Sequence, residues 1–141
     1  MTVGKACTHS VVTAHPGETA QSVAQRMAQD DVGTLIVVET HTPVGIITDR
    51  DLALRVMAKE LRPQETPVSA AMTRDPVCVT EHTALEEAIV LMRGYHARRL
   101  VVVNEHKEFV GVLSLDDLLL RLSEAQRAIA GCMRAAHSRR G

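Results

Sequence analysis

The chain has 141 residues, 45% of them hydrophobic, and a formal net charge of −1. This size suits one compact unit with an ample core, and a nearly neutral chain with two aromatic residues is not expected to bind nucleic acid. Apolar runs are too short to cross a membrane, no secretory signal is evident at the start, and three widely spaced cysteines indicate reduced thiols. We therefore expect a cytoplasmic protein.

The first half of the chain alternates between extended and helical patterns. An extended run at 10–14 precedes a helix that Thr19 can cap, with apolar residues spaced for one helix face at Ala20, Val23, Ala24 and Met27. Aliphatic runs at 34–38 and 44–48 predict two strands, joined by a polar loop at 39–43. A second helix is expected to begin at Asp49.

The second half repeats this order after a connector that contains two prolines. Residues 68–72 fit one short helical turn, and 77–80 are extended. Thr83 and Glu86 have the spacing of a capping box for a helix that runs to about Gly94. Strands near 99–103 and 109–114 and a final helix from about Asp116 complete the pattern. Each half thus reads strand, helix, strand, strand, helix.

The two halves are copies of one unit, about 65 residues apart. The run Gly45–Asp51 returns as Gly111–Asp117, with glycine, two aliphatic residues, a hydroxyl residue and then aspartate at matching places. A unit of this size cannot bury its apolar face alone, so the copies should pack on each other and form two related clefts. Beyond the repeat, apolar residues at the spacing of one helix face predict that the helix continues, with a basic end.

These paired motifs resemble a tandem pair of CBS domains. The resemblance implies an α/β (α+β) fold of two βαββα repeats about a pseudo-two-fold axis, at 8–60 and 69–124, with a linker at 61–68 and a helical tail at 125–141. It also implies a non-enzymatic regulatory module that binds AMP, ADP, ATP, NAD or S-adenosylmethionine as a regulatory ligand and requires no cofactor. A homodimer and a downstream protein partner, not identifiable from the sequence, are expected with it.

The motif chemistry agrees with a nucleotide ligand. Helix N-termini favour anions, and a carboxylate three residues after the strand end can accept hydrogen bonds from both ribose hydroxyls. Thr48 with Asp51, and Ser114 with Asp117, are the candidates. Both pairs are equally helix-capping patterns. The adenine ring is expected between aliphatic side chains and strand backbone. The candidate runs are Val12–Ala14 and Ile46–Ile47 in the first unit and Val77–Val79 and Val112–Leu113 in the second, and within them Thr13, Ala14, Ile47, Val79 and Leu113 are the selected residues.

Cations for the phosphates are less evenly distributed. By the same resemblance, Arg98 and Arg99 of the second copy face a ligand held by Asp51, and Arg50 serves the other cleft. The counterpart of Arg50 is Asp116, which repels phosphate, so the two clefts should be unequal. Solvated surface ion pairs are the alternative for these arginines.

Two other functions remain open. A dimerisation or partner-docking scaffold with degenerate clefts would show the same repeats. A small hydrolase or redox protein would use Cys7, Cys78 or Cys132, but no general base or oxyanion apparatus accompanies them. Seven scattered histidines give no spaced ligand set, so neither a metal site nor a catalytic site is expected.

Overall fold

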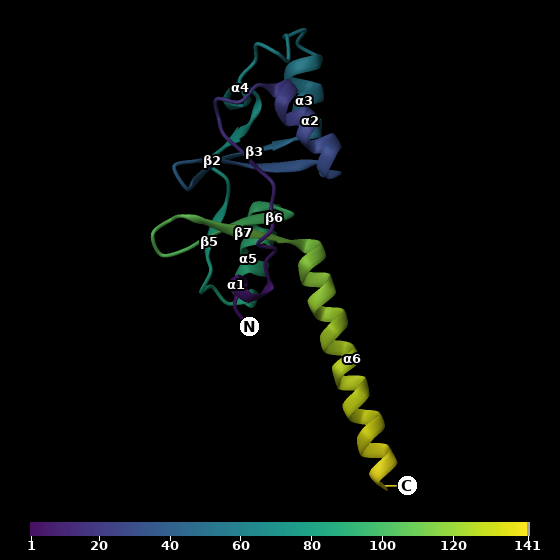
Figure 1. The fold of residues 1–141 in the computed structure, drawn as a ribbon. Coiled ribbons are helices and arrows are strands. Elements are labelled where there is room, and N and C mark those ends of the chain that lie inside the picture. Colours follow the sequence, from purple (N-terminus) through teal and green to yellow (C-terminus); the bar gives the residue numbers. More distant parts are fainter. Residues whose placement is uncertain (141) are drawn as a thin grey trace.

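The computed structural model describes residues 1–140, which form two similar units stacked sheet against sheet (Figure 1). The first unit contains β1 (Thr13–Ala14), α2 (Ala20–Asp30), β2 (Thr34–Glu39), β3 (Thr42–Thr48), α3 (Asp49–Leu52) and the π-helical turn η1 (Ala53–Met57). The second contains β5 (Cys78–Thr80), α5 (Leu85–Tyr95), β6 (Arg99–Val103), β7 (Phe109–Ser114) and α6 (Leu115–Arg140). The predicted order of elements is confirmed in both halves.

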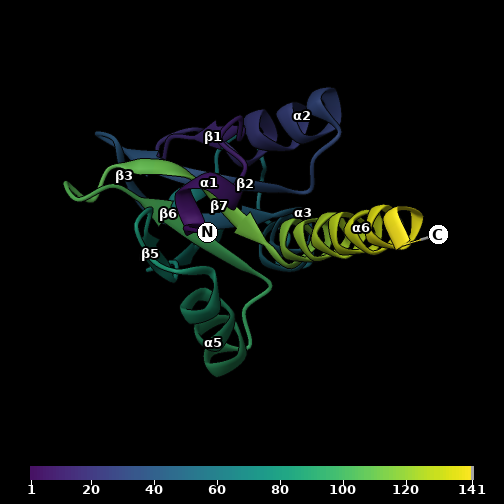
Figure 2. The ribbon, with the colours of Figure 1, turned by 90° about the horizontal axis from the view of Figure 1, so that it is seen from below.

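The two sheets have the same connections and the same irregularity. In each, the first strand pairs parallel to the second across a helix, and the second pairs antiparallel to the third. A register shift falls after Val37 in β2 and at the equivalent Val102 in β6. Helices α2 and α5 cover opposite outer sides of the stacked sheets (Figure 2). The sequence repeat is therefore a repeat of structure down to single residues.

The first hairpin is tighter than the sequence predicts. Its loop contains two residues, Thr40 and His41, with φ values of 48° and 67°, because a two-residue turn with positive φ matches the twist of the flanking strands. The expected five-residue loop is thus wrong. The carbonyl of His41 accepts a hydrogen bond of 2.7 Å from the amide of Phe109, which ties this turn to the second unit.

Two of the predicted helix caps have different outcomes. The side chain of Thr19 accepts a hydrogen bond from the amide of Ser22, as expected for the start of α2. The predicted capping box at Thr83 is wrong, because Ala84 holds the cap position of α5 and makes no side-chain cap bond. The hydroxyl of Thr83 instead pairs with that of Thr80, 3.0 Å away.

The two units exchange their leading segments. Helix α1 (Val3–Ala6), which the sequence analysis did not predict, buries Val3, Ala6 and Cys7 in the core of the second unit. Helix α4 (Val68–Ala71) and β4 (Thr73–Arg74), which precede the second unit in sequence, complete the core and sheet of the first. The first unit is therefore completed by the segment that connects the two units, and the second by a segment that precedes the first unit in sequence.

Gly45 and Gly111, the glycines of the two motifs, lie where the exchanged segments pass close to the sheets. A Cβ on Gly45 would lie 2.5 Å from the sulfur of Met72 and 3.0 Å from the carbonyl oxygen of Thr73. A Cβ on Gly111 would overlap the carbonyl oxygen of Thr8. Only a residue without a side chain allows this approach, so the glycine of each motif marks where the other leading segment passes.

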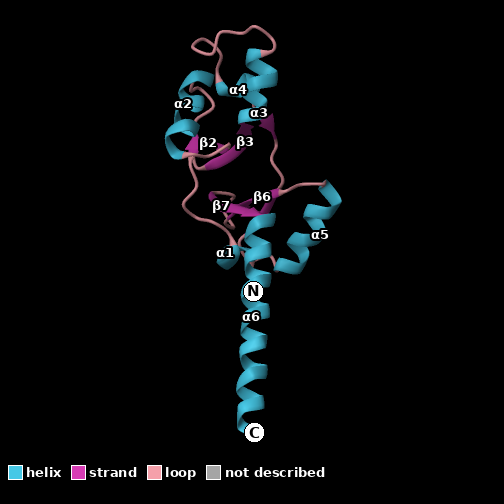
Figure 3. Cartoon of the chain, turned by 90° about the vertical axis from the view of Figure 1, so that its right-hand side faces the viewer, coloured by secondary structure: helices cyan, strands magenta, loops and turns pink. Residues whose placement is uncertain are grey.

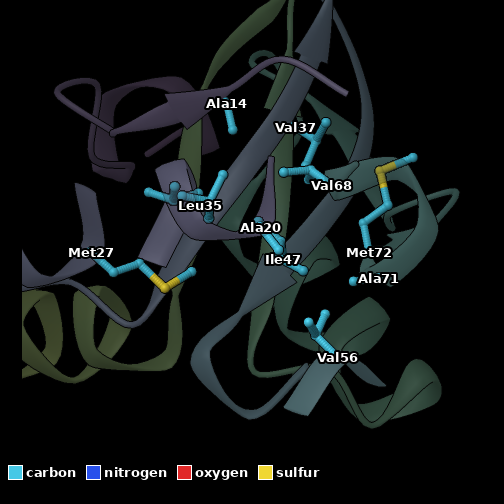
Figure 4. Packing of buried hydrophobic residues seen from close by; sticks show 11 residues of the cluster. Ala14, Ala20, Met27, Leu35, Val37, Ile47, Val56, Val68, Ala71 and Met72 are labelled. Carbon is cyan, nitrogen blue, oxygen red and sulfur yellow. The ribbon is translucent and has the colours of Figure 1, made fainter. Parts of the chain in front are cut away.

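Three apolar clusters hold the molecule together. The first packs α2, η1 and α4 on one face of the first sheet, around Leu35 and Ile47 (Figure 4). The second is its counterpart around Leu100 and Leu113. The third lies between the sheets and joins Ile36 of the first unit to Val101, Val103 and Val112 of the second. Burial between the sheets thus fixes how the units face each other.

Helix α6 is a single helix of 26 residues that continues far beyond the second unit. Its C-terminal half projects away from the rest of the chain (Figures 1 and 3). Among the helices of residues 1–140, none combines the length and the apolar character that crossing a bilayer requires.

Candidate functional site

A cleft of about 220 Å³ opens between the two units, beside the start of α6. Its walls come from three parts of the chain: the crossing segment before β1, the start of β2, and the strand ends of the second unit. The lining is mainly apolar in area, from Val11, Val12, Val32, Ile36 and Val112, but it includes the hydroxyl residues Thr8, Ser10, Thr34 and Ser114 and the charged residues Arg99 and Asp117.

Asp117 is both a helix cap and a cleft residue. Its Oδ2 atom accepts a hydrogen bond of 2.9 Å from the amide of Ser114, and the Ser114 hydroxyl accepts one of 3.1 Å from the amide of Asp117. Its Oδ1 atom accepts a bond of 3.2 Å from the hydroxyl of Thr8. A carboxylate oxygen can accept more than one hydrogen bond, so Oδ1 can still receive donors from the cleft.

Asp51 has the same capping geometry but a different neighbour. Its Oδ2 atom accepts from the amide of Thr48 at 3.0 Å, and the Thr48 hydroxyl accepts from the amide of Asp51 at 3.1 Å. Its Oδ1 atom faces Nε of Arg55 at 3.7 Å. Arg55 also donates to the carbonyl of Ala71 and the hydroxyl of Thr73.

A cation therefore stands beside the first carboxylate where a hydroxyl stands beside the second. The counterpart of Arg55 in the second unit is Arg121, which turns to the carbonyl of Lys5 at 3.2 Å and to Glu124 at 3.5 Å. The two motif sites are unequal because Arg55 is bound to its aspartate and Arg121 is bound elsewhere.

The arginines are distributed differently from the expectation. Arg99 lines the cleft of Ser114 and Asp117, whereas it was expected to serve a ligand at Asp51. It stands opposite Ser114 in the β6–β7 pairing. Arg98 lines a separate hollow of about 420 Å³ between α5 and the base of α6. Arg50 is exposed, and its amide is bound by the side chain of Asp49 at 2.8 Å.

The residues expected around the adenine ring do not line the cleft. Ala14, Ile47, Val79 and Leu113 are buried in the unit cores, and Thr13 is exposed, with its carbonyl accepting a hydrogen bond from Arg26. Neighbouring strand residues point to opposite faces, so Val112 lines the cleft and Leu113 does not. Val12 and Val112, which belong to the same candidate runs, are the members that line the cleft.

Sequence reasoning also missed Thr8 and Val11. Both belong to the crossing segment at 8–12, which opens the first repeat and reaches the second unit through the bridge from Thr8 to Val112. Because only the exchange of segments brings them to Asp117, neither spacing nor periodicity could have identified them. A useful signal was Gly111, whose missing side chain requires a close backbone neighbour.

Cys7 lies beside a histidine, with its Sγ atom 3.7 Å from Nε2 of His9, and that ring nitrogen also lies 2.8 Å from the carbonyl oxygen of Gly4. Burial raises the pKa of the Cys7 thiol, and the negative charges of Asp117 and Glu81 raise it further. A thiol with a raised pKa forms little of the nucleophilic thiolate near neutral pH. No three side chains of the metal-ligating types converge in the described part of the chain.

Comparison with known proteins identifies the family. A family model for the CBS domain matches the chain twice, over residues 3–58 and 68–124. The CBS domain-containing protein YhcV of Bacillus subtilis is 35% identical over 130 residues, which cover 92% of this chain and 91% of YhcV. The uncharacterized protein MK0525 of Methanopyrus kandleri is 32% identical over 120 residues, which cover 84% of this chain and 61% of that relative.

A solved structure shares the fold. The CBS domain protein PAE2072 from Pyrobaculum aerophilum, complexed with AMP, superposes with a TM-score of 0.74 at 28% identity, covering 88% of this chain and 99% of that one. This chain has the two matched repeats and the two similar sheets that the family model and the solved structure lead one to expect. It therefore belongs to the CBS-domain family and contains two CBS domains in tandem.

Proposed function

We propose that this chain is a non-enzymatic regulatory module that binds an adenosine-containing ligand in the cleft at Ser114 and Asp117. Proteins of the family are generally regulatory, and PAE2072 is complexed with AMP. The observation that carries the proposal is the placing of Asp117: a carboxylate oxygen open to further donors, in an apolar cleft between the units.

Each part of such a ligand meets suitable chemistry in the cleft. Adenine fits the apolar surface of Val11, Val112 and Ile36. The ribose hydroxyls would donate to Oδ1 of Asp117 and take the place of the Thr8 hydroxyl. Arg99, a cationic side chain in the lining of the cleft, would interact with a phosphate. AMP, ADP, ATP, NAD and S-adenosylmethionine all contain the adenosine that these residues would bind.

The size of the cleft favours recognition of the nucleoside over the phosphates. Enclosed sites for drug-sized ligands measure roughly 300 Å³ or more, and this cleft measures about 220 Å³. A nucleotide would therefore keep its base and sugar inside and its phosphates at the open edge. Charge at that edge is screened by solvent, so affinity should vary only moderately with the number of phosphates.

Binding would act on the arrangement of the two units. The cleft is shared between Val32, Thr34 and Ile36 of the first unit and the motif residues of the second. A ligand that touches both units favours the arrangement in which its contacts with both are made, by no more than its difference in affinity between arrangements. The module would pass this change on as a cytoplasmic homodimer to a downstream protein.

A scaffold without a ligand is the second candidate, and Arg55 is the observation that favours it. Its approach to Oδ1 of Asp51 leaves the first motif satisfied by the protein itself. If the Thr8 hydroxyl satisfies Oδ1 of Asp117 in the same way, neither motif binds a ligand, and the paired repeats serve only to dock a partner protein.

Isothermal titration calorimetry with adenosine, AMP, ATP, NAD and S-adenosylmethionine tests the proposal. Asp117→Asn keeps the shape and one acceptor oxygen, and Asp51→Asn is the matched control in the other repeat. Losing a hydrogen bond to a charged group costs about 1.5–3 kcal/mol, so Asp117→Asn should weaken binding roughly tenfold or more, and Asp51→Asn much less. If the unaltered protein binds none of these ligands at millimolar concentration, the scaffold is correct.

A further inference from the structure

The projecting half of α6 and an apolar hollow at its base have complementary surfaces. The hollow measures about 570 Å³ and lies between α5 and the first turns of α6. Its lining is almost entirely aliphatic and includes Leu85, Ile89, Leu118 and Leu122. Soluble proteins rarely leave such a surface open without an occupant.

The apolar residues of α6 form a continuous stripe that extends from this hollow to the tip. They recur at intervals of three and four residues, the spacing of a helix that packs against another helix. Ile129 and Met133, in the projecting half, are 61% and 68% exposed. The stripe comprises Leu115, Leu118, Leu119, Leu122, Ala125, Ile129, Cys132, Met133 and Ala136.

Charge decides how two such helices would lie. Residues 126–140 contain four arginines and no acidic residue, whereas residues 115–125 contain three acidic residues and one arginine. Glu86 on the rim of the hollow and Glu87 beside it add negative charge at the base. A parallel pair would place the arginines of one tip beside those of the other. An antiparallel pair places each basic tip against an acidic base and also opposes the helix dipoles.

We propose that α6 of a second copy of this chain lies antiparallel along α6, with its tip in the hollow at the base of the first. The same exchange fills both hollows, as a closed two-fold dimer requires. With the dimer axis near Gln126, Ile129 and Cys132 of one helix lie against Ala125, Leu122 and Leu119 of the other. The stripe then alternates large and small residues, which allows close packing.

This inference rests on the proposed homodimer but not on ligand binding. It specifies a surface outside the cleft and an orientation that the cleft does not determine. Sedimentation equilibrium therefore tests the homodimer by itself, calorimetry tests the cleft, and disulfide trapping tests the helix exchange.

Disulfide trapping uses the natural Cys132 as one partner. The exposed Cys78 is replaced by serine, and Leu122→Cys or Leu119→Cys is added in that background, since the two positions sample neighbouring registers. Leu122 and Leu119 are 57% and 61% exposed, so these changes should not disturb the fold. Within one helix the new thiol and Cys132 are separated by roughly 15 Å or more, too far for a bond inside one chain.

Brief oxidation with copper phenanthroline, followed by non-reducing electrophoresis and peptide mass spectrometry, gives the result. We expect most of at least one variant to become a covalent dimer joined from position 122 or 119 to Cys132. The Cys78→Ser parent should stay uncrosslinked, because antiparallel helices keep the two Cys132 thiols roughly 15 Å apart. A Cys132–Cys132 dimer in the parent would prove a parallel pair and overturn the proposal. So would the absence of an intermolecular bond in both variants while sedimentation shows a dimer.

Discussion

Gly111→Ala tests whether the close crossing at the second motif holds the molecule together. The added methyl group would overlap the carbonyl oxygen of Thr8 and lie 3.1 Å from the sulfur of Cys7. The obstructing atom is backbone, fixed by two hydrogen bonds of 2.9 and 3.0 Å between Thr8 and Val112. It cannot turn aside as a side chain would, so the crossing segment must move away from the sheet.

The cost follows from these contacts. Forcing a methyl group into a filled site costs about 1–3 kcal/mol, and each of the two bridge hydrogen bonds contributes about 1 kcal/mol. We expect Gly111→Ala to lower the free energy of unfolding by about 3 kcal/mol. At a urea m-value of about 2 kcal/mol/M, the midpoint falls by about 1.5 M.

The control is Gly94→Ala in α5, where an added Cβ meets no atom within 4 Å. Alanine is the better helix residue, so this change should leave stability unchanged or raise it by up to about 1 kcal/mol. Urea unfolding followed by circular dichroism measures both variants. If Gly111→Ala unfolds within 1 kcal/mol of the unaltered protein, the crossing segment moves freely and the explanation of the motif glycine is wrong.

Three further outcomes follow from single residues. Arg99→Gln should weaken AMP binding several-fold more than adenosine binding in calorimetry, and equal losses would exclude a phosphate role. The hydrogen bond from Arg26 lowers the pKa of Glu18, so the pair stabilises the fold above the ordinary carboxyl pKa and this stability is lost as pH falls through the lowered value. Urea unfolding of Glu18→Gln should therefore show a deficit of about 1 kcal/mol at pH 7 that shrinks as the pH falls below the ordinary carboxyl pKa, and a deficit independent of pH would contradict this reasoning. Because burial raises the pKa of Cys7, iodoacetamide at pH 8 should modify Cys7 roughly tenfold more slowly in the folded protein than in urea, and mass spectrometry showing equal rates would count against the buried thiol.

The repeated architecture could be predicted from the sequence because local patterns encode it. Apolar residues at the spacing of one helix face, with Thr19 at the helix start, indicate α2 without long-range information. Thr83 shows the limit of such rules, because its hydroxyl had a nearer partner in Thr80 than the helix amide. The positions of α1 and α4 were not predictable in this way, since they depend on contacts between residues 50 or more positions apart, such as Val68 with Glu18 and Val3 with Thr83.

The candidate site was predicted in part for the same reason. Ser114 and Asp117 stand in one local motif, and the structure places both in the cleft with Arg99. The apolar wall depends on strand register, in which a shift of one residue exchanges Val112 for Leu113. The contact of Thr8 with Asp117 depends on the path of the crossing segment, and the position of the Arg55 side chain depends on its hydrogen bond to Ala71 of α4. No local sequence pattern connects either residue to the motif.

The packing of α1 in the core of the second unit has a consequence for biosynthesis. Residues 1–7 are synthesised before the second unit, yet Val3, Ala6 and Cys7 pack against strands and helices of that unit. They therefore cannot reach their place in its core until the second unit has been synthesised. Cutting the chain between the two units, before α4, would give two fragments that each lack a segment carried by the other.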